Sequence, residues 1–433
     1  MSVLIAGAGL AGSEAAWQLL RRGVAVELID IKPIAFTPAH HSEGFAELVC
    51  SNSLRAEGVL NAVGLLKEEM RRLGSLVMEA ADATRVPAGG ALAVDREAFS
   101  RFITERLTGH RLLRYESREL TALPDDRLAI IATGPLTTGA LSAAITEAFG
   151  TAQLSFFDAA APIVEADSID RERVFFQSRY DKGEADYINC PMDREQYDAF
   201  YRALLSAETA ELHGFEQGQV FEGCLPIEVL AGRGYDTMRF GPLKPVGLVD
   251  PATGRMPHAV VQLRQDNAAK TLYNLVGFQT RLKFGEQKRV FSMIPGLERA
   301  RFARYGVMHR NTYLNSPALL TSTYCSKSRP NLYFAGQLSG VEGYVESAAS
   351  GLLCGIHAAQ RFLGKKPEPF PPETAMGALA HYVATPGRRD FQPMNVNFGI
   401  LAPLNLKASG RKDRNTKLAE RALHIVDRLA KNL

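Results

Sequence analysis

The sequence has few cysteines, and they do not form pairs. Five are present, an odd number, at the widely separated positions 50, 190, 224, 325 and 354. This spacing lacks the close pairs of a zinc site or of a secreted disulfide framework. We therefore expect reduced thiols, a cytoplasmic protein and no bound metal.

Long apolar runs and a strong net charge are also lacking. No stretch of about 18 apolar residues occurs, which excludes a membrane-spanning helix. Glycines interrupt the apolar residues 2–6, so these do not form a signal peptide and we expect no export. Fifty basic and 47 acidic side chains give a net charge of +3, too slight by itself to indicate a nucleic-acid partner. The 46% hydrophobic content over 433 residues is typical of a globular protein of two or three domains.

A nucleotide-binding pattern stands at the start of the chain. Residues 2–6 are predicted as a strand, 10–22 as a helix and 24–29 as a second strand. The motif G-x-G-x-x-G, formed by Gly7, Gly9 and Gly12, lies between the first strand and the helix. These glycines would permit a tight turn, a close approach of a pyrophosphate and close helix packing. Asp30 follows the second strand and could accept hydrogen bonds from a ribose.

The motif indicates a dinucleotide without separating FAD from NAD. Ala-Thr-Gly at 132–134 and a second glycine-rich strand end at 335–336 favour FAD, because a flavin in such folds is contacted by both parts of the chain. Shaping a turn is the alternative role for the later glycines. Glu346 is a further residue that could line the flavin. The predicted cofactor-binding residues are Gly7, Gly9, Leu10, Ala11, Gly12, Asp30, Gly336, Gln337, Glu342, Gly343, Tyr344 and Ser347.

The alternation of strands and helices predicts an α/β fold with a parallel sheet. We expect a Rossmann-like FAD-binding domain with an inserted α+β domain. The first part of the FAD-binding domain covers residues 1–160, the insertion 161–324, and the second part, with C-terminal helices, 325–433. Residues 32–55 read as a loop, and Asp95 is expected to open a helix.

Several longer segments carry a resemblance to a known family. In chain order they are HHSEGFAELVCSNSLR (40–55), EGCLPIE (222–228), MRFGPLKPVGL (238–248), 277–297, YGVMHRNTYLNSP (305–317), AGQLSGVEGYVESAASG (335–351) and 394–399. The chain resembles the TrmFO family of folate- and FAD-dependent tRNA (uracil-5-)-methyltransferases. More distantly it resembles the MnmG/GidA flavoproteins, which carry an additional C-terminal helical region. Asp30 stands where the TrmFO family commonly has glutamate, and we expect FAD binding to survive this difference.

The resemblance implies a methyl transfer that does not use S-adenosylmethionine. Its product is 5-methyluridine in the T-loop of tRNA, with 5,10-methylenetetrahydrofolate as carbon donor, reduced FAD as electron source and NADPH or NADH to regenerate it. Carbon 5 of uracil becomes nucleophilic when a thiolate adds at carbon 6. By resemblance, Cys224 is this nucleophile and Cys50 helps to remove the carbon 5 proton or to release the product, although the two roles could be exchanged. The other cysteines are expected to be structural.

Candidate substrate contacts follow from the same resemblance. His309, Arg310 and Asn311 could bind the folate, although a lone histidine is commonly structural. Clustered basic side chains suit the T arm of tRNA, and no obligate protein partner is implied. Each cluster could instead be an ordinary solvated face. The candidates are Arg281, Lys283, Lys288 and Arg289, then Lys407, Arg411, Lys412 and Arg414, with a further group at Arg299, Arg301, Arg304 and Arg310.

Other functions remain open from the sequence. A plain FAD-dependent oxidoreductase of a small metabolite would need neither cysteine nor tRNA. A wobble-uridine modifier of the MnmG type is disfavoured by the short C-terminal part of this chain. An RNA-binding protein that uses FAD only for stability would leave Cys50 and Cys224 unexplained.

Overall fold

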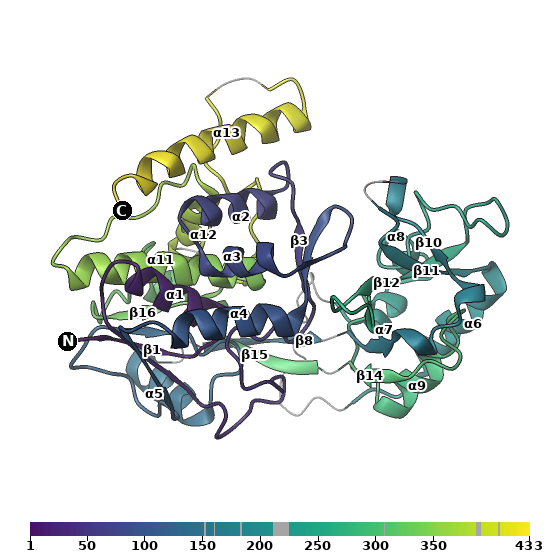
Figure 1. Cartoon of the computed structure of the whole chain (residues 1–433), viewed down its shortest axis with the longest axis horizontal. Coiled ribbons are helices and arrows are strands. Elements are labelled where there is room, and N and C mark those ends of the chain that lie inside the picture. The colour runs from purple at the N-terminus through teal and green to yellow at the C-terminus, as the bar shows by residue number, and fades with distance from the viewer. Residues whose placement is uncertain are drawn as a thin grey trace.

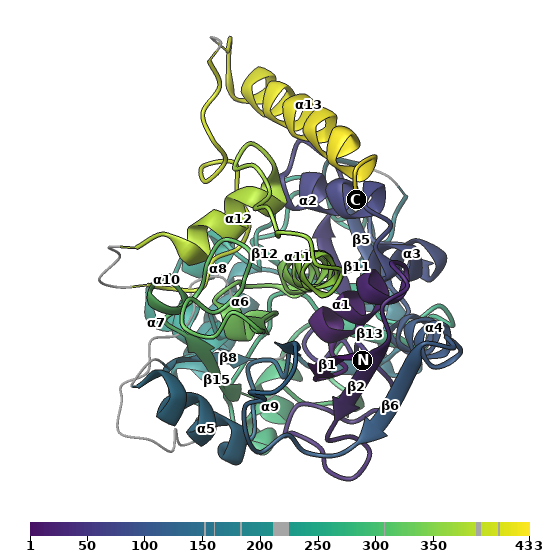
Figure 2. The ribbon, with the colours of Figure 1, turned by 90° about the vertical axis from the view of Figure 1, so that its left-hand side faces the viewer.

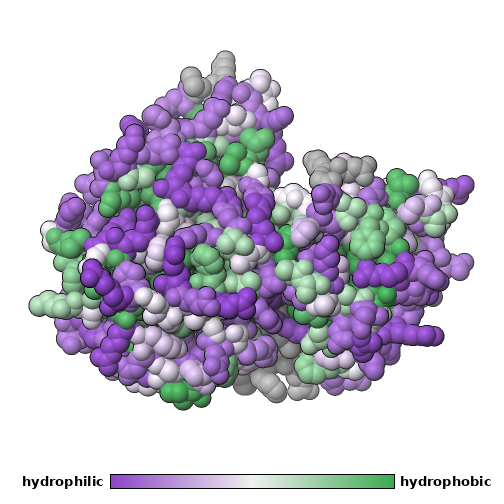
Figure 3. All heavy atoms as spheres, in the orientation of Figure 1, coloured by the Kyte–Doolittle hydropathy of each residue, from purple (hydrophilic) through white to green (hydrophobic). Residues whose placement is uncertain are grey.

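The computed structural model shows two lobes (Figure 1). One lobe is built from both ends of the sequence, and the other is built from its middle. The surface of the molecule is hollowed between the lobes on one side (Figure 3). No helix among the described residues is both long and apolar enough to cross a membrane. The structure describes residues 1–150, 153–159, 161–181, 184–210, 225–306, 308–386, 391–405 and 408–433.

The first lobe is organised around a five-stranded parallel sheet. Its strand order is β16-β7-β1-β2-β6, and every neighbouring pair is parallel. The predicted first strand and the later strand near residue 332 thus lie in one sheet, because β7 pairs with both. The strands are β1 (Val3–Ala6), β2 (Val26–Asp30), β6 (Leu113–Ser117), β7 (Ala129–Ile131) and β16 (Leu332–Phe334).

Helices cover both faces of this sheet. Helices α1 and α11 lie side by side on one face (Figure 2). Leu141 and Ile145 of α5 pack on the other face, against a cluster that includes Leu4 and Ile131. The side chain of Asp95 caps α4, as its position predicted, by accepting the N–H of Ala98. The helices of this lobe are α1 (Leu10–Leu20), α2 (Ala62–Arg72), α3 (Leu76–Ala83), α4 (Arg96–Thr108), α5 (Gly139–Phe149), α11 (Tyr344–Phe362), α12 (Ala375–Ala384) and α13 (Arg411–Ala430).

A small antiparallel sheet follows the long loop after β2. Residues 32–55 were expected to be a loop, but β3 already begins at Ser53, because Ser53 pairs with Ala93 in β5. The order is β3-β5-β4, and this sheet lies beside the second lobe. Its strands are β3 (Ser53–Ala56), β4 (Arg85–Val86) and β5 (Ala91–Val94).

The second lobe contains a six-stranded antiparallel sheet and, in the part of the chain that the structure describes, four α-helices. The strand order is β10-β11-β12-β13-β9-β14, with a separate core that includes Ile188, Phe200 and Phe278. This arrangement confirms an α/β fold with an inserted α+β region. The elements are β9 (Ile163–Glu165), β10 (Phe175–Phe176), β11 (Tyr187–Met192), α6 (Arg194–Ser206), α7 (Ile227–Gly232), α8 (Thr237–Phe240), β12 (Ala259–Gln265), β13 (Leu272–Leu275), α9 (Phe284–Phe291) and β14 (Phe302–Arg304).

Two further strands connect the lobes. Strands β8 (Gln153–Ala159) and β15 (Met308–Leu314) pair antiparallel, and the short helix α10 (Ser316–Leu319) follows. Leu314 and Leu320 belong to the core of the first lobe, together with residues of β1. The domain boundaries at 160 and 324 remain predictions.

Candidate functional site

A cavity of about 450 Å³ lies at the carboxyl ends of the central parallel strands. Residues that follow β1, β2, β7 and β16 line it from the first lobe, and Arg264, Asn274 and Gln279 line it from the second. The carboxyl edge of a parallel sheet is where open α/β folds bind their ligands. All the predicted cofactor-binding residues except Gly12 line this one cavity.

The glycine motif forms an open turn at the start of α1. Gly7 has φ of 102°, and a Cβ there would lie 2.4 Å from the Ala132 carbonyl oxygen. A Cβ at Gly12 would lie 1.8 Å from the Gly7 carbonyl oxygen, so Gly12 serves packing rather than contact with the cavity. A Cβ at Gly9 would meet nothing within 4 Å, and no side chain caps the helix there. The first N–H groups of α1 are therefore available to a phosphate.

Asp30 fixes the geometry of this turn. Its Oδ2 accepts the N–H of Ala8 at 2.6 Å, and its Oδ1 accepts the N–H of Lys32 at 2.9 Å. Each carboxylate oxygen can accept a second hydrogen bond. Asp30 can thus hold the turn and still accept a hydroxyl group from a ligand in the cavity.

The start of α11 forms the opposite wall. Gly343 precedes the helix with φ of 107°, and no side chain caps the helix. Gln337 and Glu342 bind each other, with 2.8 Å between Nε2 and Oε2. Two helix N-termini without side-chain caps, those of α1 and α11, therefore border one cavity. Such N-termini favour an anionic or electron-rich ligand, so the residues present fit a dinucleotide with a flavin ring.

Glu346 lies apart from this wall. It is fully buried, forms an ion pair with Arg55 and accepts the N–H of Val396 at 3.0 Å. The backbone around Arg55 is held by Lys67. The Lys67 ammonium group donates to the carbonyl oxygen of Leu54 at 2.7 Å and to that of Arg55 at 3.1 Å. Burial lowers the pKa of Lys67 to about 7. These contacts fix β3, which continues from the loop of Cys50.

Cys50 is half-buried and lines the same cavity. The Tyr344 hydroxyl accepts the N–H of Cys50 at 2.5 Å and the N–H of Ser51 at 3.2 Å. Because Tyr344 is the first residue of α11, the predicted flavin wall also positions the thiol loop. The sequence could not predict this contact between Cys50 and Tyr344, because the two residues are 294 positions apart.

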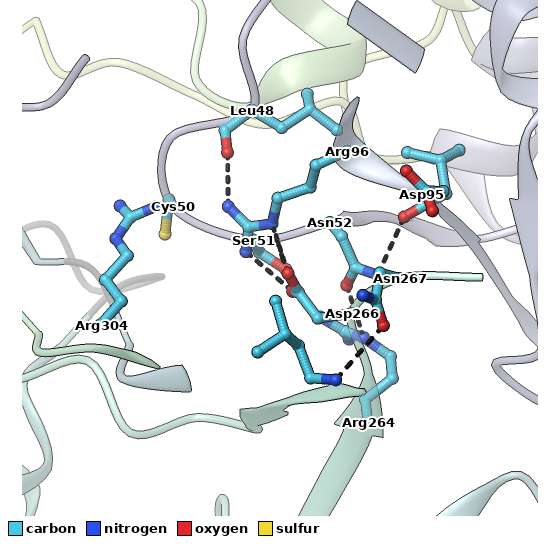
Figure 4. A network of polar contacts seen from close by, with 12 residues as sticks. Leu48, Cys50, Ser51, Asn52, Asp95, Arg96, Arg264, Asp266, Asn267 and Arg304 are labelled. Carbon is cyan, nitrogen blue, oxygen red and sulfur yellow. Dashed lines mark hydrogen bonds and ion pairs between the residues drawn. The ribbon is translucent and has the colours of Figure 1, made fainter. Parts of the chain in front are cut away.

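A polar network joins the thiol loop to the second lobe (Figure 4). Arg264 on β12 donates to Asn52 Oδ1 at 3.1 Å and to Ser51 Oγ at 2.7 Å. Asn52 donates to the Gln265 carbonyl oxygen at 2.9 Å. Ser51 and Asn52 lie in the segment 40–55 that carries the family resemblance, but the sequence analysis predicts no role for them. No pattern in the sequence indicates this role of Arg264, because its partners are more than 200 positions away.

Other cysteines are placed away from solvent. Cys190, Cys325 and Cys354 are buried, and burial raises the pKa of each thiol. A raised pKa keeps them as unreactive thiols, in agreement with a structural role. Cys224, predicted as the nucleophile, lies outside the described residues.

Of the three folate candidates, only Asn311 has a described side chain. Asn311 is buried and lines the cavity. The backbones of His309 and Arg310 belong to β15, which pairs with β8, while their side chains lie outside the described part of the chain.

The predicted basic clusters differ in their surroundings. On and beside α9, Lys283 binds Glu208 at 2.7 Å and Arg289 binds Glu286 at 2.5 Å. Arg281 lies 3.7 Å from Glu228, and Lys288 is exposed. Arg411, Lys412 and Arg414 are exposed on α13, which lies over α2 in Figure 1, whereas Lys407 lies outside the described residues.

No group of three or more acidic, histidine or cysteine side chains placed for a metal occurs among the described residues.

The split Rossmann-like lobe, its glycine turn and the inserted lobe define the class as a dinucleotide-binding flavoprotein. A family model described as "Glucose inhibited division protein A" matches residues 2–366. The chain belongs to this wider family. Its similarity to full-length relatives shows that it also belongs to the TrmFO family. Those relatives bear the name methylenetetrahydrofolate–tRNA-(uracil-5-)-methyltransferase TrmFO.

The relatives cover nearly the whole chain. The one from Listeria monocytogenes serotype 4b (strain F2365) is 60% identical over 432 residues, covering 100% of this chain and 99% of the relative. The one from Desulforudis audaxviator (strain MP104C) is 62% identical over 422 residues, covering 97% and 96%. Among solved structures, Aquifex aeolicus GidA in crystal form I has a TM-score of 0.72 at 17% identity, covering 100% of this chain and 76% of that one. This structural likeness confirms the flavoprotein fold.

Proposed function

We propose that this protein methylates carbon 5 of the T-loop uridine of tRNA, in the cytoplasm, to give 5-methyluridine. The carbon comes from 5,10-methylenetetrahydrofolate, and reduced FAD, regenerated by NADPH or NADH, is the reductant. Full-length relatives at about 60% identity support the reaction class. The observation that carries the proposal is that Cys50 lines the same cavity as the dinucleotide turn.

The chain would hold FAD by backbone contacts. The turn at Gly7 and Gly9 would face the pyrophosphate, Asp30 the ribose, and the start of α11 the flavin ring. When bound, FAD supplies the two electrons that reduce the transferred one-carbon unit to a methyl group. The protein supplies orientation and the thiols.

The two thiols divide the work on the uracil. The Cys224 thiolate adds at carbon 6, which makes carbon 5 nucleophilic. Carbon 5 then forms a bond to the methylene carbon as the bond from that carbon to one folate nitrogen breaks. Its bond to the second folate nitrogen breaks in the two-electron reduction to methyl, and tetrahydrofolate leaves. Cys50 takes the carbon 5 proton while the electron pair stays in the ring, and the bond from carbon 6 to Cys224 breaks to release the thiolate. Location in the cavity supports the proton-accepting role of Cys50.

Separate groups of residues would bind the folate and the tRNA. Asn311 lines the cavity and, with His309 and Arg310, is proposed to bind the folate. The exposed residues Arg411 and Lys412 on α13 are proposed to contact phosphates of the T arm. No protein partner is part of the proposal.

A labelling experiment tests the function. The FAD-bound protein is incubated with NADPH, methylenetetrahydrofolate labelled at its methylene carbon, and unmodified tRNA transcript, and the RNA is digested to nucleosides. We expect label in 5-methyluridine with wild type, and none with Cys224→Ala or Cys50→Ala. Cys325→Ala is the control, because Cys325 does not line the cavity.

Other outcomes would identify the alternatives. Flavin reduction without label in RNA contradicts methyl transfer and favours a small-metabolite oxidoreductase. Label in the wobble nucleoside would favour the alternative of a wobble-uridine modifier, which the sequence left open.

A further inference from the structure

Three arginines from three different elements surround the loop of Cys50 (Figure 4). Arg96 on α4 donates to the Leu48 carbonyl oxygen, Arg304 on β14 donates to the Val49 carbonyl oxygen, and Arg264 on β12 donates to Ser51. Two of these elements belong to the second lobe. The loop is therefore held on both sides of Cys50 by guanidinium groups.

Acidic side chains do not balance these charges. Asp266 is buried and forms an ion pair with Arg96 at 3.0 Å. Glu47 is directed to backbone N–H groups, those of His41 at 3.0 Å and Ser42 at 3.1 Å. The hydrogen bonds of Arg264 described above end on neutral oxygens. The surroundings of the loop consequently carry an excess of positive charge, which is less screened when buried than at a surface.

Arg304 is the arginine that contacts the residue directly before Cys50. Its Nε is buried, and no hydrogen-bond acceptor among the described residues reaches it. Its guanidinium group lies beside Cys50 in Figure 4. Burial and, next, Arg96 lower the pKa of Arg304, while Tyr344, Cys50 and Glu47 act in the opposite direction. An anion at Cys50 would offset part of the desolvation cost of this half-buried cation.

We propose that Arg304, supported by Arg264 and Arg96, stabilises Cys50 as a thiolate. This inference rests on the proposed function, in which Cys50 accepts the carbon 5 proton. The thiol first loses its proton to solvent, and the resulting thiolate then takes the proton from carbon 5 and returns to the neutral thiol. Arg304 touches neither uracil nor folate in this scheme and is a positioning residue. Further ionisable groups near the loop of Cys50, among the described residues, include Tyr344 on α11 and Glu47 on the preceding loop.

The rate of alkylation by iodoacetamide reports the thiolate directly. The FAD-bound protein is treated over a range of pH, and modification of the Cys50 peptide is followed by mass spectrometry. We expect a wild-type midpoint below about 8.5, the value of an unperturbed cysteine. Arg304→Gln should raise the midpoint by about one pH unit and slow alkylation at neutral pH about tenfold. Arg304→Lys should retain most of the wild-type behaviour, because the charge remains.

A neighbouring arginine provides a matched control. Arg301, just before β14, is exposed and binds Glu165 at 2.7 Å and Asp167 at 2.6 Å. Arg301→Gln should leave the midpoint of Cys50 unchanged, since Arg301 does not contact the loop. An equal shift in Arg301→Gln and Arg304→Gln would overturn the proposal.

Wild type alone also decides the question if Arg304→Gln does not retain FAD. A wild-type Cys50 midpoint at or above about 8.5 contradicts a stabilised thiolate, as does an unchanged midpoint in a folded Arg304→Gln variant. The assay uses neither folate nor tRNA. Failure of methyl transfer and failure of this inference are therefore distinguishable.

Discussion

Within the first lobe, helices α1 and α11 make close backbone contacts, whereas several contacts between the two lobes are made by polar side chains. Within the first lobe, a Cβ on Gly351 of α11 would lie 2.1 Å from the Ala11 carbonyl oxygen of α1. Between the lobes, Arg96 binds Asp266, Arg264 binds Asn52, and Gly89 donates to Asp186 at 2.7 Å. The dinucleotide site is shaped by close backbone contacts. The loop of Cys50 is held by polar contacts between the lobes.

From this difference we expect that a substitution can disturb the dinucleotide site or the loop of Cys50 without disturbing the other. A backbone contact has no room to adjust, so its loss should disturb both folding and nucleotide binding. A polar contact between lobes can be weakened while each lobe keeps its own core. Changes at the junction should therefore alter the thiol loop before they affect FAD.

The largest effect is expected from Gly351→Ala. The added Cβ would collide with the Ala11 carbonyl oxygen, so α1 and α11 must separate. We expect a loss of about 3 kcal/mol of unfolding free energy and poor FAD retention, measured by denaturant unfolding and by flavin absorbance. Gly139→Ala is the control, because a Cβ there meets nothing within 4 Å. Equal stability of the two variants would contradict the close-contact interpretation.

A smaller loss is expected from Asn52→Ala at the junction. Asn52 is fully buried, donates to Val94 at 3.0 Å and to Gln265, and accepts from Arg264. We expect the unfolding free energy to fall by about 2 kcal/mol, with FAD retained and methyl transfer reduced at least tenfold. Asn61→Ala, at an exposed position, should change neither property. Loss of FAD from Asn52→Ala would show that the dinucleotide site and the loop of Cys50 are not disturbed separately.

A pH effect is expected within the first lobe. Glu69 is fully buried and accepts the N–H groups of Ala375 at 2.6 Å and Met376 at 2.9 Å. Burial raises its pKa from the ordinary value of 4.5 to about 8, with the backbone hydrogen bonds acting in the opposite direction. Between these two pH values the folded protein holds a proton that the unfolded chain has lost. Its contribution to stability is fully present below pH 4.5 and is lost as the pH rises through 8.

Unfolding of Glu69→Gln tests this sign. The wild type should lose up to about 1.4 kcal/mol per pH unit from this group, and the variant should lose less over the same range. Denaturant unfolding at several pH values, with His381→Gln on the neighbouring helix α12 as a control, makes the measurement. A steeper pH dependence in Glu69→Gln than in wild type would contradict the raised pKa.

The smallest effect is expected from the exposed basic clusters. On α13, Arg411→Gln with Lys412→Gln should raise the KM for tRNA about threefold and reduce its dependence on salt. Lys283→Gln with Arg289→Gln should have less effect, because Glu208 and Glu286 already pair with these side chains. Steady-state methylation at two salt concentrations checks both. A larger effect on and beside α9 than on α13 would reverse the proposed order.

Local pattern was enough to predict the parallel lobe, while the junction required the structure. The glycine turn and the Asp95 cap depend on neighbours within a few positions, so spacing reveals them. Arg304 was grouped with Arg301 as a phosphate-binding residue, but it binds the Val49 carbonyl oxygen instead. Arg301 lies just before β14 and pairs with Glu165 and Asp167, whereas Arg304 ends the strand and contacts the loop of Cys50. Contacts across hundreds of positions, such as that of Arg264 with Asn52, leave no periodic signal.

The contact between Gly351 and Ala11 has a consequence for synthesis of the protein. Helix α1 is synthesised more than 300 residues before its packing partner α11, which begins only at Tyr344. The inserted lobe, with its own core, is made in between and can fold first. The nucleotide site is then completed late in translation, which leaves α1 in need of temporary protection until α11 arrives.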